Sequence, residues 1–332
     1  MKSSNEELFH SVVKKLDVFY PLVKLVNSKD VLSLSDLEPF FDSILIEDIL
    51  YLQHIFLESG KLRSCGNPSF IHSLRCLIWS KALFCDLTCS QISLYHDYVE
   101  DFGHSFDDYD RLLKTVPHNL RDNINFLTNK YSVIINSLDF SVGLSGLIKQ
   151  LTLLSENKVL SVSVAHLLSS ITQVETNIED FFRSNSYKFY IDDLVSFVGS
   201  SDNESILLVK FFDRLDNTLT ELPGKFNFIV KLYNKNLVLL DSSKDFVLNS
   251  SNPLLKLSFA LLYIRSLDQV QALRMRYAEM SQFRGDFYGR QYLKLCSSLD
   301  LVGHKLSRLS KSVEIILSDS EVVLLIEKNF KK

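Results

Sequence analysis

The chain has 332 residues, of which 46% are hydrophobic, and a formal net charge of −4 at neutral pH. This length allows one large domain or two, and 24 Phe residues supply a substantial core. The negative charge argues against a general nucleic-acid-binding protein, which needs a basic surface to neutralise phosphates. Only 10 Gly and 6 Pro are present, too few for a turn-rich β-sandwich or barrel. The composition therefore predicts an all-α fold built from long helices.

The cysteines and the N-terminus bear on the cellular compartment. Five cysteines are present, an odd number without a Cys-x-x-Cys pair, which is simplest to explain by a reducing cytosol. The N-terminus, Met-Lys-Ser-Ser-Asn-Glu-Glu, lacks the apolar core of a signal peptide. No uncharged apolar run is long enough to cross a bilayer. We therefore expect a soluble cytoplasmic protein with no membrane partner.

An N-terminal helical segment is predicted over residues 1–60. Ser4-x-x-Glu7 and Ser35-x-x-Glu38 both have the form of a helix capping box, and each precedes residues with helical apolar spacing. Nothing in this segment carries chemistry, and it is expected to contribute packing alone.

A loop and a helix follow over residues 61–84. Gly66 and Pro68 indicate the loop, and Pro68 suits the start of a helix. The apolar spacing of Ile71, Leu74 and Ile78 then predicts a helix with His72 in its first turn. A lone helical histidine is usually a packing or surface residue, so His72 needs a second source of ligands before it indicates a metal.

The stretch from Leu94 to Phe102, read as a helix, has one apolar face and one polar face. Thr88-x-x-Gln91 would open this helix as a further capping box. The polar face carries His96, Asp97, Glu100 and Asp101. A nitrogen with carboxylate oxygens suits a divalent metal, and the further acids could move protons on bound water. The same pattern also fits an ordinary amphipathic helix with solvated acids, and this stretch alone does not decide.

Residues 131–190 are apolar, rich in serine and chemically featureless. Helices are expected around 144–154 and 164–174. His166 has no acidic neighbour in helical register, so it is expected to pack in the core. We predict that this segment has a structural role and carries no chemistry.

A largely buried helix is predicted from a Ser201-x-x-Glu204 cap to Pro223-Gly224, because its residues are apolar almost all round. Asp213 lies in its middle, and a buried carboxylate is costly unless it is paired or bound to metal. An ion pair with Lys210 or Arg214 is one solution. Metal binding is the other, and it gains support only when Asp213 is considered together with the histidines upstream.

The C-terminal third is mostly helical. Residues 225–242 fit a strand and a helix, with a slight preference for helix. Residues 255–310 are predicted to be helical and are the most basic part of the chain. Residues 313–330 fit either a helix or a hairpin, so a minor β-hairpin is allowed beside the bundle.

Three motifs together resemble the hydrolase domain of Rel/Spo-type alarmone enzymes, a branch of the HD phosphohydrolase superfamily. Residues 63–72 resemble the family's Arg-x-Ser-Gly-x-Pro-Tyr-x-x-His opening. Residues 96–101 resemble its His-Asp-x-x-Glu-Asp core, and residues 210–217 its Lys-x-x-Asp-Arg-x-x-Asn helix. The resemblance implies an HD-domain helical bundle over 61–295, with an extra insertion at about 131–186. Segments 1–60 and 296–332 would flank it.

The resemblance also implies a function, the removal of pyrophosphate from the ribose 3′ position of guanosine tetra- or pentaphosphate to give GDP or GTP. The substrate would be a guanine nucleotide and the cofactor one Mn²⁺ ion. The implied metal ligands are His72, His96, Asp97 and Asp213. Glu100 and Asp101 would serve the water and the leaving group, while Arg63 would hold the base, Asn217 the sugar and Thr220 a further part of the nucleotide.

Several departures from the family pattern leave alternatives open. Ser64-Cys65 replaces a usual basic-Ser pair, and Asp216 stands where histidine is commoner. No synthetase domain is recognisable. A phosphohydrolase acting on another nucleotide is therefore one alternative. A catalytically inactive nucleotide sensor that binds a partner is another, although Glu100 and Asp101 count against it. Nothing in the sequence predicts the oligomeric state.

Overall fold

The computed structural model describes residues 2–29, 31–62, 68–103, 105–157, 160–171, 177–201, 203–220, 226–283 and 286–330. It is 86% helical and has no strand in these ranges, which confirms the predicted all-α fold. An isolated antiparallel bridge joins Leu62 and Pro68. The chain divides into two compact units, the first made of Met1–Leu94 with Leu208–Lys332 and the second of Tyr95–Leu207.

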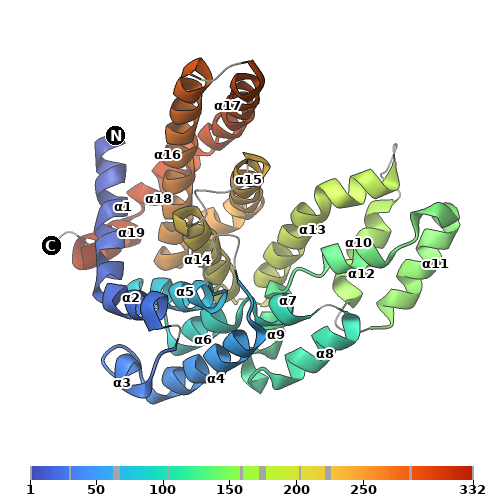
Figure 1. Cartoon of the computed structure of the whole chain (residues 1–332), viewed down its shortest axis with the longest axis horizontal. Coiled ribbons are helices and arrows are strands. Elements are labelled where there is room, and N and C mark those ends of the chain that lie inside the picture. The colour runs from blue at the N-terminus through green and yellow to red at the C-terminus, as the bar shows by residue number, and fades with distance from the viewer. Residues whose placement is uncertain are drawn as a thin grey trace. The chain divides into compact units, whose positions relative to one another are not determined.

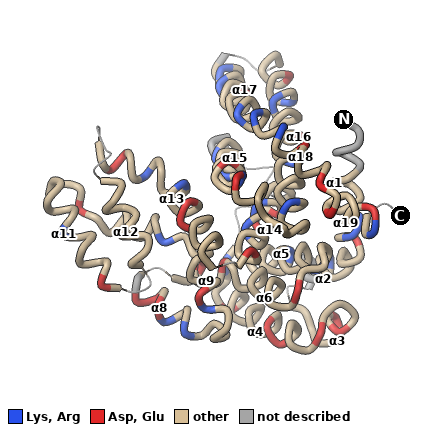
Figure 2. Tube along the Cα trace, turned by 180° about the vertical axis from the view of Figure 1, so that it is seen from behind, with Lys and Arg blue, Asp and Glu red and all other residues tan. Residues whose placement is uncertain are grey.

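The first unit is a bundle of helices from both ends of the chain. Its helices are α1 (Lys2–Leu16), α2 (Tyr20–Lys29), α3 (Leu34–Leu37), α4 (Ser43–Ser59), α5 (Phe70–Ala82), α6 (Leu87–Tyr95), α14 (Ser205–Thr220), α15 (Phe226–Asn249), α16 (Pro253–Phe283), α17 (Asp286–Ser307), α18 (Ser310–Ser318) and α19 (Ser320–Phe330). In Figure 1, α16 runs beside α17 over much of its length. Lys and Arg residues gather along α17 and the neighbouring part of α16 (Figure 2). The core includes Trp79, Phe211 and Phe259, which are fully buried.

The second unit contains the region predicted as an insertion. Its helices are α7 (Tyr98–Phe102), α8 (Phe106–Thr115), α9 (Arg121–Leu127), α10 (Tyr131–Ser137), α11 (Gly143–Ser155), α12 (Ser161–Ser170) and α13 (Ile178–Ser201). Helices α10 and α12 both pack against α13. Aromatic rings line this contact: the ring of Phe189 on α13 lies 5.8 Å from that of Tyr131 on α10 and 4.9 Å from that of His166 on α12.

The predicted capping boxes are wrong in position, and at two of the helices a neighbouring residue makes the cap. At α3 the box consists of Ser33 and Asp36, two residues before the predicted pair. At α6 the Asp86 carboxylate accepts from the Cys89 N–H at 2.7 Å, so Asp86 rather than Thr88 caps the helix. Ser4 lies inside α1, and Ser201 is the last residue of α13. A short polar residue near a helix start is thus a signal for a boundary but does not fix it.

The ambiguous C-terminal segments are helical. Residues 226–249 form α15, which confirms the slight preference for helix over strand. Residues 310–318 and 320–330 form α18 and α19, so no hairpin occurs in this part of the described chain. Among the described helices, none taken singly is long and apolar enough to cross a membrane. A bent pair, Tyr131–Ser137 with Phe140–Ser155, meets the length and composition test when taken together.

Candidate metal centre

His72 is the centre of a buried polar cluster in the first unit. It lies in the first turn of α5, as predicted, and is 1% exposed. Its Nδ1 is 2.7 Å from Oδ2 of Asp216, and its Nε2 is 3.2 Å from Oδ1 of Asp213. Both carboxylates come from α14, where a three-residue separation puts them on one face. Each ring nitrogen of His72 therefore faces its own carboxylate.

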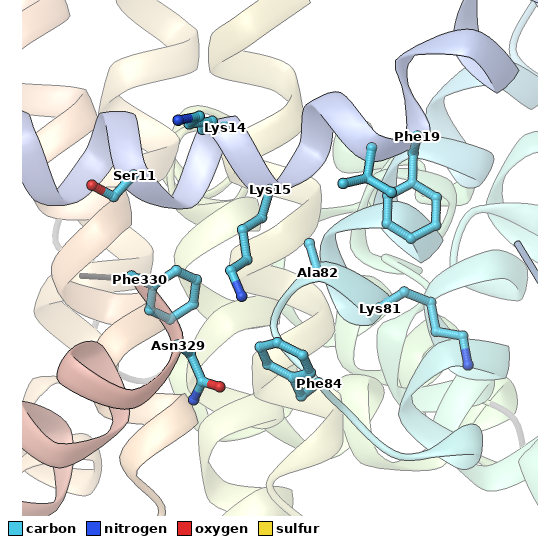
Figure 3. Close-up of a pocket in the computed structure, with 10 residues that line it drawn as sticks. Ser11, Lys14, Lys15, Phe19, Lys81, Ala82, Phe84, Asn329 and Phe330 are labelled. Carbon is cyan, nitrogen blue, oxygen red and sulfur yellow. The ribbon is translucent and has the colours of Figure 1, made fainter. Parts of the chain in front are cut away.

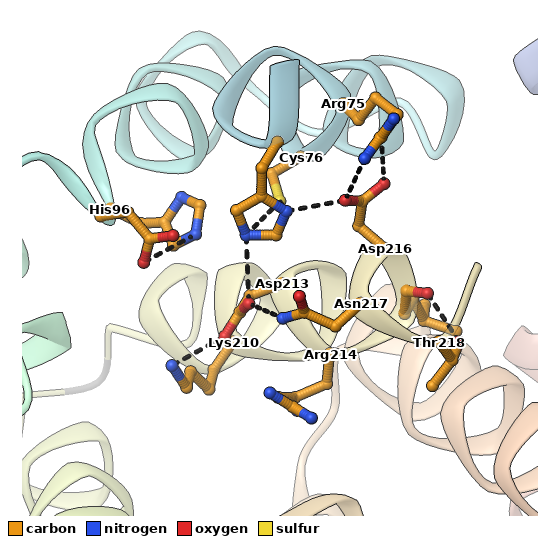
Figure 4. Close-up of polar contacts among 12 residues, drawn as sticks. Arg75, Cys76, His96, Lys210, Asp213, Arg214, Asp216, Asn217 and Thr218 are labelled. Carbon is orange, nitrogen blue, oxygen red and sulfur yellow. Dashed lines mark hydrogen bonds and ion pairs between the residues drawn. The ribbon is translucent and has the colours of Figure 1, made fainter. Parts of the chain in front are cut away.

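Asp216 is also held by Arg75. The guanidinium of Arg75 donates from Nε to Oδ1 at 2.7 Å and from Nη2 to Oδ2 at 3.2 Å (Figure 4). Burial raises the pKa of the Asp216 carboxyl, but Arg75 and His72 outweigh it and leave the pKa below its usual value. Asp216 thus stays ionised and accepts the Nδ1–H of His72.

Asp213 has the ion pair that the sequence left as an alternative. Lys210 Nζ lies 2.8 Å from its Oδ2, and Asn217 Nδ2 donates to its Oδ1 at 2.5 Å (Figure 4). Arg214 instead donates from Nε to Oδ1 of Asn236 at 2.8 Å. Burial raises the pKa of Asp213, but Lys210 and His72 bring it well below the usual value. Asp213 therefore remains a charged acceptor beside His72.

The hydrogen bond to Asp216 determines what the other ring nitrogen can do. If Nδ1 of His72 carries the proton, Nε2 presents a lone pair towards Oδ1 of Asp213. Two acceptors at 3.2 Å repel each other unless a cation lies between them or the ring is protonated. Two adjacent ligands of one metal, each about 2.1 Å from it, lie about 3 Å apart, close to this separation. Metal-binding histidines also commonly donate their other N–H to a carboxylate, as His72 does here.

Cys76 is a candidate ligand that the sequence interpretation missed. It lies one turn after His72 on α5, and its Sγ is 3.8 Å from Nε2 and 3.9 Å from Nδ1. Its sulfur and the His72 nitrogens belong to a group with metal-binding spacing. The i, i+4 separation on one helix was the signal that could have revealed it.

The helix predicted over residues 94–102 is wrong at its centre. Helix α6 ends at Tyr95 and α7 begins at Tyr98, so His96 and Asp97 lie in the turn between them. His96 is buried rather than on an exposed polar face, and its Nε2 is 3.2 Å from Oδ1 of half-buried Asp97. The turn breaks the register on which the two-faced pattern depended.

The two predicted proton-transfer residues lie on α7 in the second unit. Glu100 is exposed, and its Oε2 accepts from the Asn129 N–H at 3.1 Å. Asp101 is half-buried, and its N–H donates to the Asp97 carbonyl at 2.7 Å. Glu100 thus has the access that a group exchanging protons with water requires.

The predicted nucleotide contacts are described only in part. Asn217 is buried and donates to Asp213. Arg63 lies outside the described residues, as does the side chain of Thr220 at the end of α14. The structure thus brings His72, Asp213 and Asn217 together within the first unit, and His96 and Asp97 within the second.

Two cavities of the first unit are lined in part by α5, the helix that carries His72. One of about 120 Å³ is lined by Arg75 and Asp216, together with Tyr20 and Trp79. A second, of about 570 Å³, is lined by residues including Lys14, Lys15, Lys81, Phe84 and Phe330 (Figure 3). The ammonium of Lys15 lies 4.7 Å from the centre of the Phe84 ring and 5.2 Å from that of Phe330. The larger cavity contains none of the predicted site residues.

No protein-family model, curated protein or solved structure matches the chain. The likeness to alarmone hydrolases therefore depends on the three ordered motifs. The geometry around His72 does not depend on that likeness, because a buried histidine between two ionised carboxylates calls for an explanation in any protein. The metal, the substrate and the reaction are accordingly matters for proposal.

Proposed function

We propose that this chain binds a divalent metal, manganese, and removes pyrophosphate from the ribose 3′ position of guanosine tetra- or pentaphosphate. The observation that carries the proposal is the arrangement of His72, whose two ring nitrogens face two buried, ionised carboxylates. Such an arrangement suits a histidine that donates through Nδ1 and binds metal through Nε2. The order of the three motifs supports the choice of reaction and substrate.

On the family pattern, His72, Asp213, His96 and Asp97 would be the metal ligands. When bound, the metal lowers the pKa of a coordinated water and so provides a nucleophile at neutral pH. Asp216 would orient the His72 ring through its Nδ1–H. Lys210 would balance part of the charge of Asp213.

Glu100 and Asp101 would move protons to and from the attacking water and the leaving pyrophosphate. The exposed carboxylate of Glu100 suits exchange with solvent. Arg63 and Thr220 would contact the nucleotide on the family pattern alone. Asn217, placed by that pattern at the sugar, also holds Asp213 through its Nδ2. Asn217 would then both contact the substrate and orient the metal ligand Asp213.

Cys76 favours a second candidate, a centre that holds zinc. Thiolate and imidazole ligands select softer ions such as zinc, whereas carboxylates and water suit manganese. The sulfur lies within 3.9 Å of both nitrogens of His72. A Cys76→Ser variant separates the two, since loss of the sulfur should weaken zinc binding and leave manganese binding unchanged.

Two other functions are compatible with the same site. Another nucleotide phosphate would use the same metal and acids, and an inactive sensor would bind nucleotide without turnover. We place the protein in the cytoplasm, where the thiols of Cys76, Cys85, Cys89 and Cys296, none of which is in a disulfide, would stay reduced.

The test is pyrophosphate release from purified protein with a panel of metals and of guanine and adenine nucleotides. We expect manganese-dependent release from guanosine tetraphosphate and its loss in Asp213→Ala. Asp245→Ala is the matched control, because the Asp245 side chain is 86% exposed and lies outside the cluster. Hydrolysis of a different nucleotide would move the proposal to the first alternative. Binding without hydrolysis of any would favour the sensor.

A further inference from the structure

A buried lysine in the second unit has no part in the proposed metal site. Lys130 precedes α10 and is only 6% exposed. Its ammonium makes no hydrogen bond or ion pair with any residue that the structure describes, and its Nζ lies 6.0 Å from the centre of the Phe126 ring. Lysines are almost never buried without a partner, since an unpaired charge is costly in an apolar setting. The burial of Lys130 therefore calls for a physical explanation.

Lys130 lines a small cavity of the second unit that also holds a polar atom with no partner. The cavity has a volume of about 210 Å³ and is lined by residues including Asn125, Phe126, Ser163, Tyr190 and Asp193. The side-chain carbonyl oxygen of Asn125 is buried, and nothing in the described part of the chain donates to it. An amine and an unsatisfied acceptor thus share one cavity wall. Buried polar atoms without partners are rare, and such an acceptor beside the amine of a buried lysine in one cavity points to a ligand.

Asp193, the acid among the residues that line this cavity, is bonded to other side chains. Its Oδ1 lies 2.6 Å from Nδ1 of His166, and its Oδ2 accepts a hydrogen bond from the Tyr131 hydroxyl. No acid lies in helical register with His166, and Asp193 reaches it instead from α13, a contact that the sequence analysis did not predict. The hydrogen bond with Asp193 raises the pKa of His166, although burial opposes it. Asp193 is thus committed to this network and does not pair with Lys130.

We propose that this cavity binds a small hydroxy-aldehyde or hydroxyketone, and that the Lys130 amine forms an imine with its carbonyl carbon. The nitrogen lone pair attacks the carbon, and a proton passes from nitrogen to oxygen to give a carbinolamine. The hydroxyl then leaves as water once it is protonated, and the carbon–nitrogen double bond forms. One carbonyl and one amine give one imine and one water. Asp193 with its His166 partner is the titratable pair beside the cavity that could exchange these protons.

The chemistry requires a neutral amine, and the environment supplies one. Burial lowers the pKa of Lys130 to about 7, although the charge of Asp193 opposes the shift. About half of the Lys130 side chains are then neutral at pH 7, on the order of 10³ times the neutral fraction of an ordinary lysine with a pKa near 10.4. Lysines desolvated in apolar pockets are activated in this way for imine formation.

The volume of the cavity and the polar groups in its wall limit the class of ligand that it can hold. A volume of about 210 Å³ is below the range of roughly 300–1,000 Å³ typical of drug-sized ligands, so the ligand has few heavy atoms. The free Asn125 oxygen calls for a hydrogen-bond donor, which a ligand hydroxyl provides. The Asp193 carboxylate in the wall disfavours an anionic ligand. A short, neutral, hydroxylated carbonyl compound fits these three conditions together.

The test traps the imine in the intact wild-type chain. The protein is incubated at neutral pH with dihydroxyacetone and reduced with borohydride, and the modified peptides are identified by mass spectrometry. We expect an adduct on Lys130 that forms at least about tenfold faster than on exposed Lys149 in the same unit, because a far larger fraction of its amine is neutral. Equal or slower modification of Lys130 would refute the proposal. This comparison uses one folded chain and does not depend on how a variant folds.

Variants then test the ligand class. Lys130→Met should abolish the preferred adduct, whereas Lys149→Met should leave it unchanged. With acetone in place of dihydroxyacetone, the Lys130 adduct should form several-fold more slowly, and Asn125→Leu should remove that difference. Retention of the difference in Asn125→Leu would exclude the proposed hydroxyl contact. None of these outcomes depends on metal binding or on nucleotide hydrolysis.

Discussion

Removal of the Asp213 carboxylate should separate its two roles, as an ion-pair partner and as a metal ligand. A metal that binds the folded chain alone stabilises it by about 2.7 kcal/mol at 100 times its dissociation constant. For a folding unit of roughly 150–250 residues, 1 kcal/mol corresponds to about 2–4 °C in melting temperature. Wild-type protein should therefore melt ~5–11 °C higher with saturating manganese. Asp213→Ala should lose this metal-dependent increase.

The same substitution also has a cost that does not involve metal. Lys210 lies 2.8 Å from Asp213 in the core, and both side chains are buried. Loss of one partner leaves a buried charge uncompensated, which typically costs about 3–5 kcal/mol. Asp213→Ala should thus lower the melting temperature even without metal. The double variant Lys210→Met/Asp213→Ala should recover much of that loss, because it removes both charges.

The assay is thermal unfolding of the wild type, the single variant and the double variant, each with and without manganese, beside metal analysis after gel filtration. If Asp213 is a ligand, the double variant regains stability but not the metal-dependent increase. If no metal binds this cluster, wild-type protein shows no increase in melting temperature with manganese. An undiminished increase in Asp213→Ala would refute its assignment as a ligand.

Two further variants test other parts of the site. Glu100→Gln should keep the fold and the metal but lower turnover by about 10²–10⁴-fold, since a positioned acid or base contributes that much, and unchanged turnover would make Glu100 a solvated surface residue. Because the folded pKa of Asp216 lies below its unfolded value, its contribution to stability is complete above about pH 4 and falls as pH drops through the folded pKa. Asp216→Asn should consequently flatten the acid limb of the stability curve, measured by circular dichroism, and an unchanged limb would contradict the sign of this pKa shift.

Local patterns predicted the scaffold of the site well. Apolar spacing placed His72 in the first turn of a helix that is indeed α5. The same argument predicted a buried Asp213 on α14 and offered Lys210 as its partner, and the ion pair is present. These features depend on helical periodicity and on the cost of burying a charge, both of which can be evaluated within a few turns of sequence.

Pairings between distant segments could not be predicted in this way. Asp216 reaches His72 across 144 positions of the chain, and Asp193 reaches His166 from another helix. His96 and Asp97 lie in a turn because α6 ends at Tyr95, without any glycine or proline to indicate it. Tertiary packing determines such contacts and the break between α6 and α7. A single sequence shows only the local preference, which tertiary packing can override.

The charge balance around His72 leads to a last prediction, for Lys210. Within this cluster, the carboxylates of Asp213 and Asp216 are each paired with a cation, Lys210 and Arg75 respectively. A divalent ion adds two positive charges to this buried, balanced group, so the Lys210 ammonium opposes its binding.

Lys210→Met should therefore tighten manganese binding by about tenfold, the equivalent of ~1.4 kcal/mol, in a direct titration. The opposite view is that Lys210 mainly orients Asp213, whose Oδ2 it contacts while Oδ1 faces His72. Loss of such an orienting group typically weakens metal binding by about 10–100-fold. The two explanations predict changes of opposite sign, so one titration of Lys210→Met decides between charge and orientation as the role of this lysine.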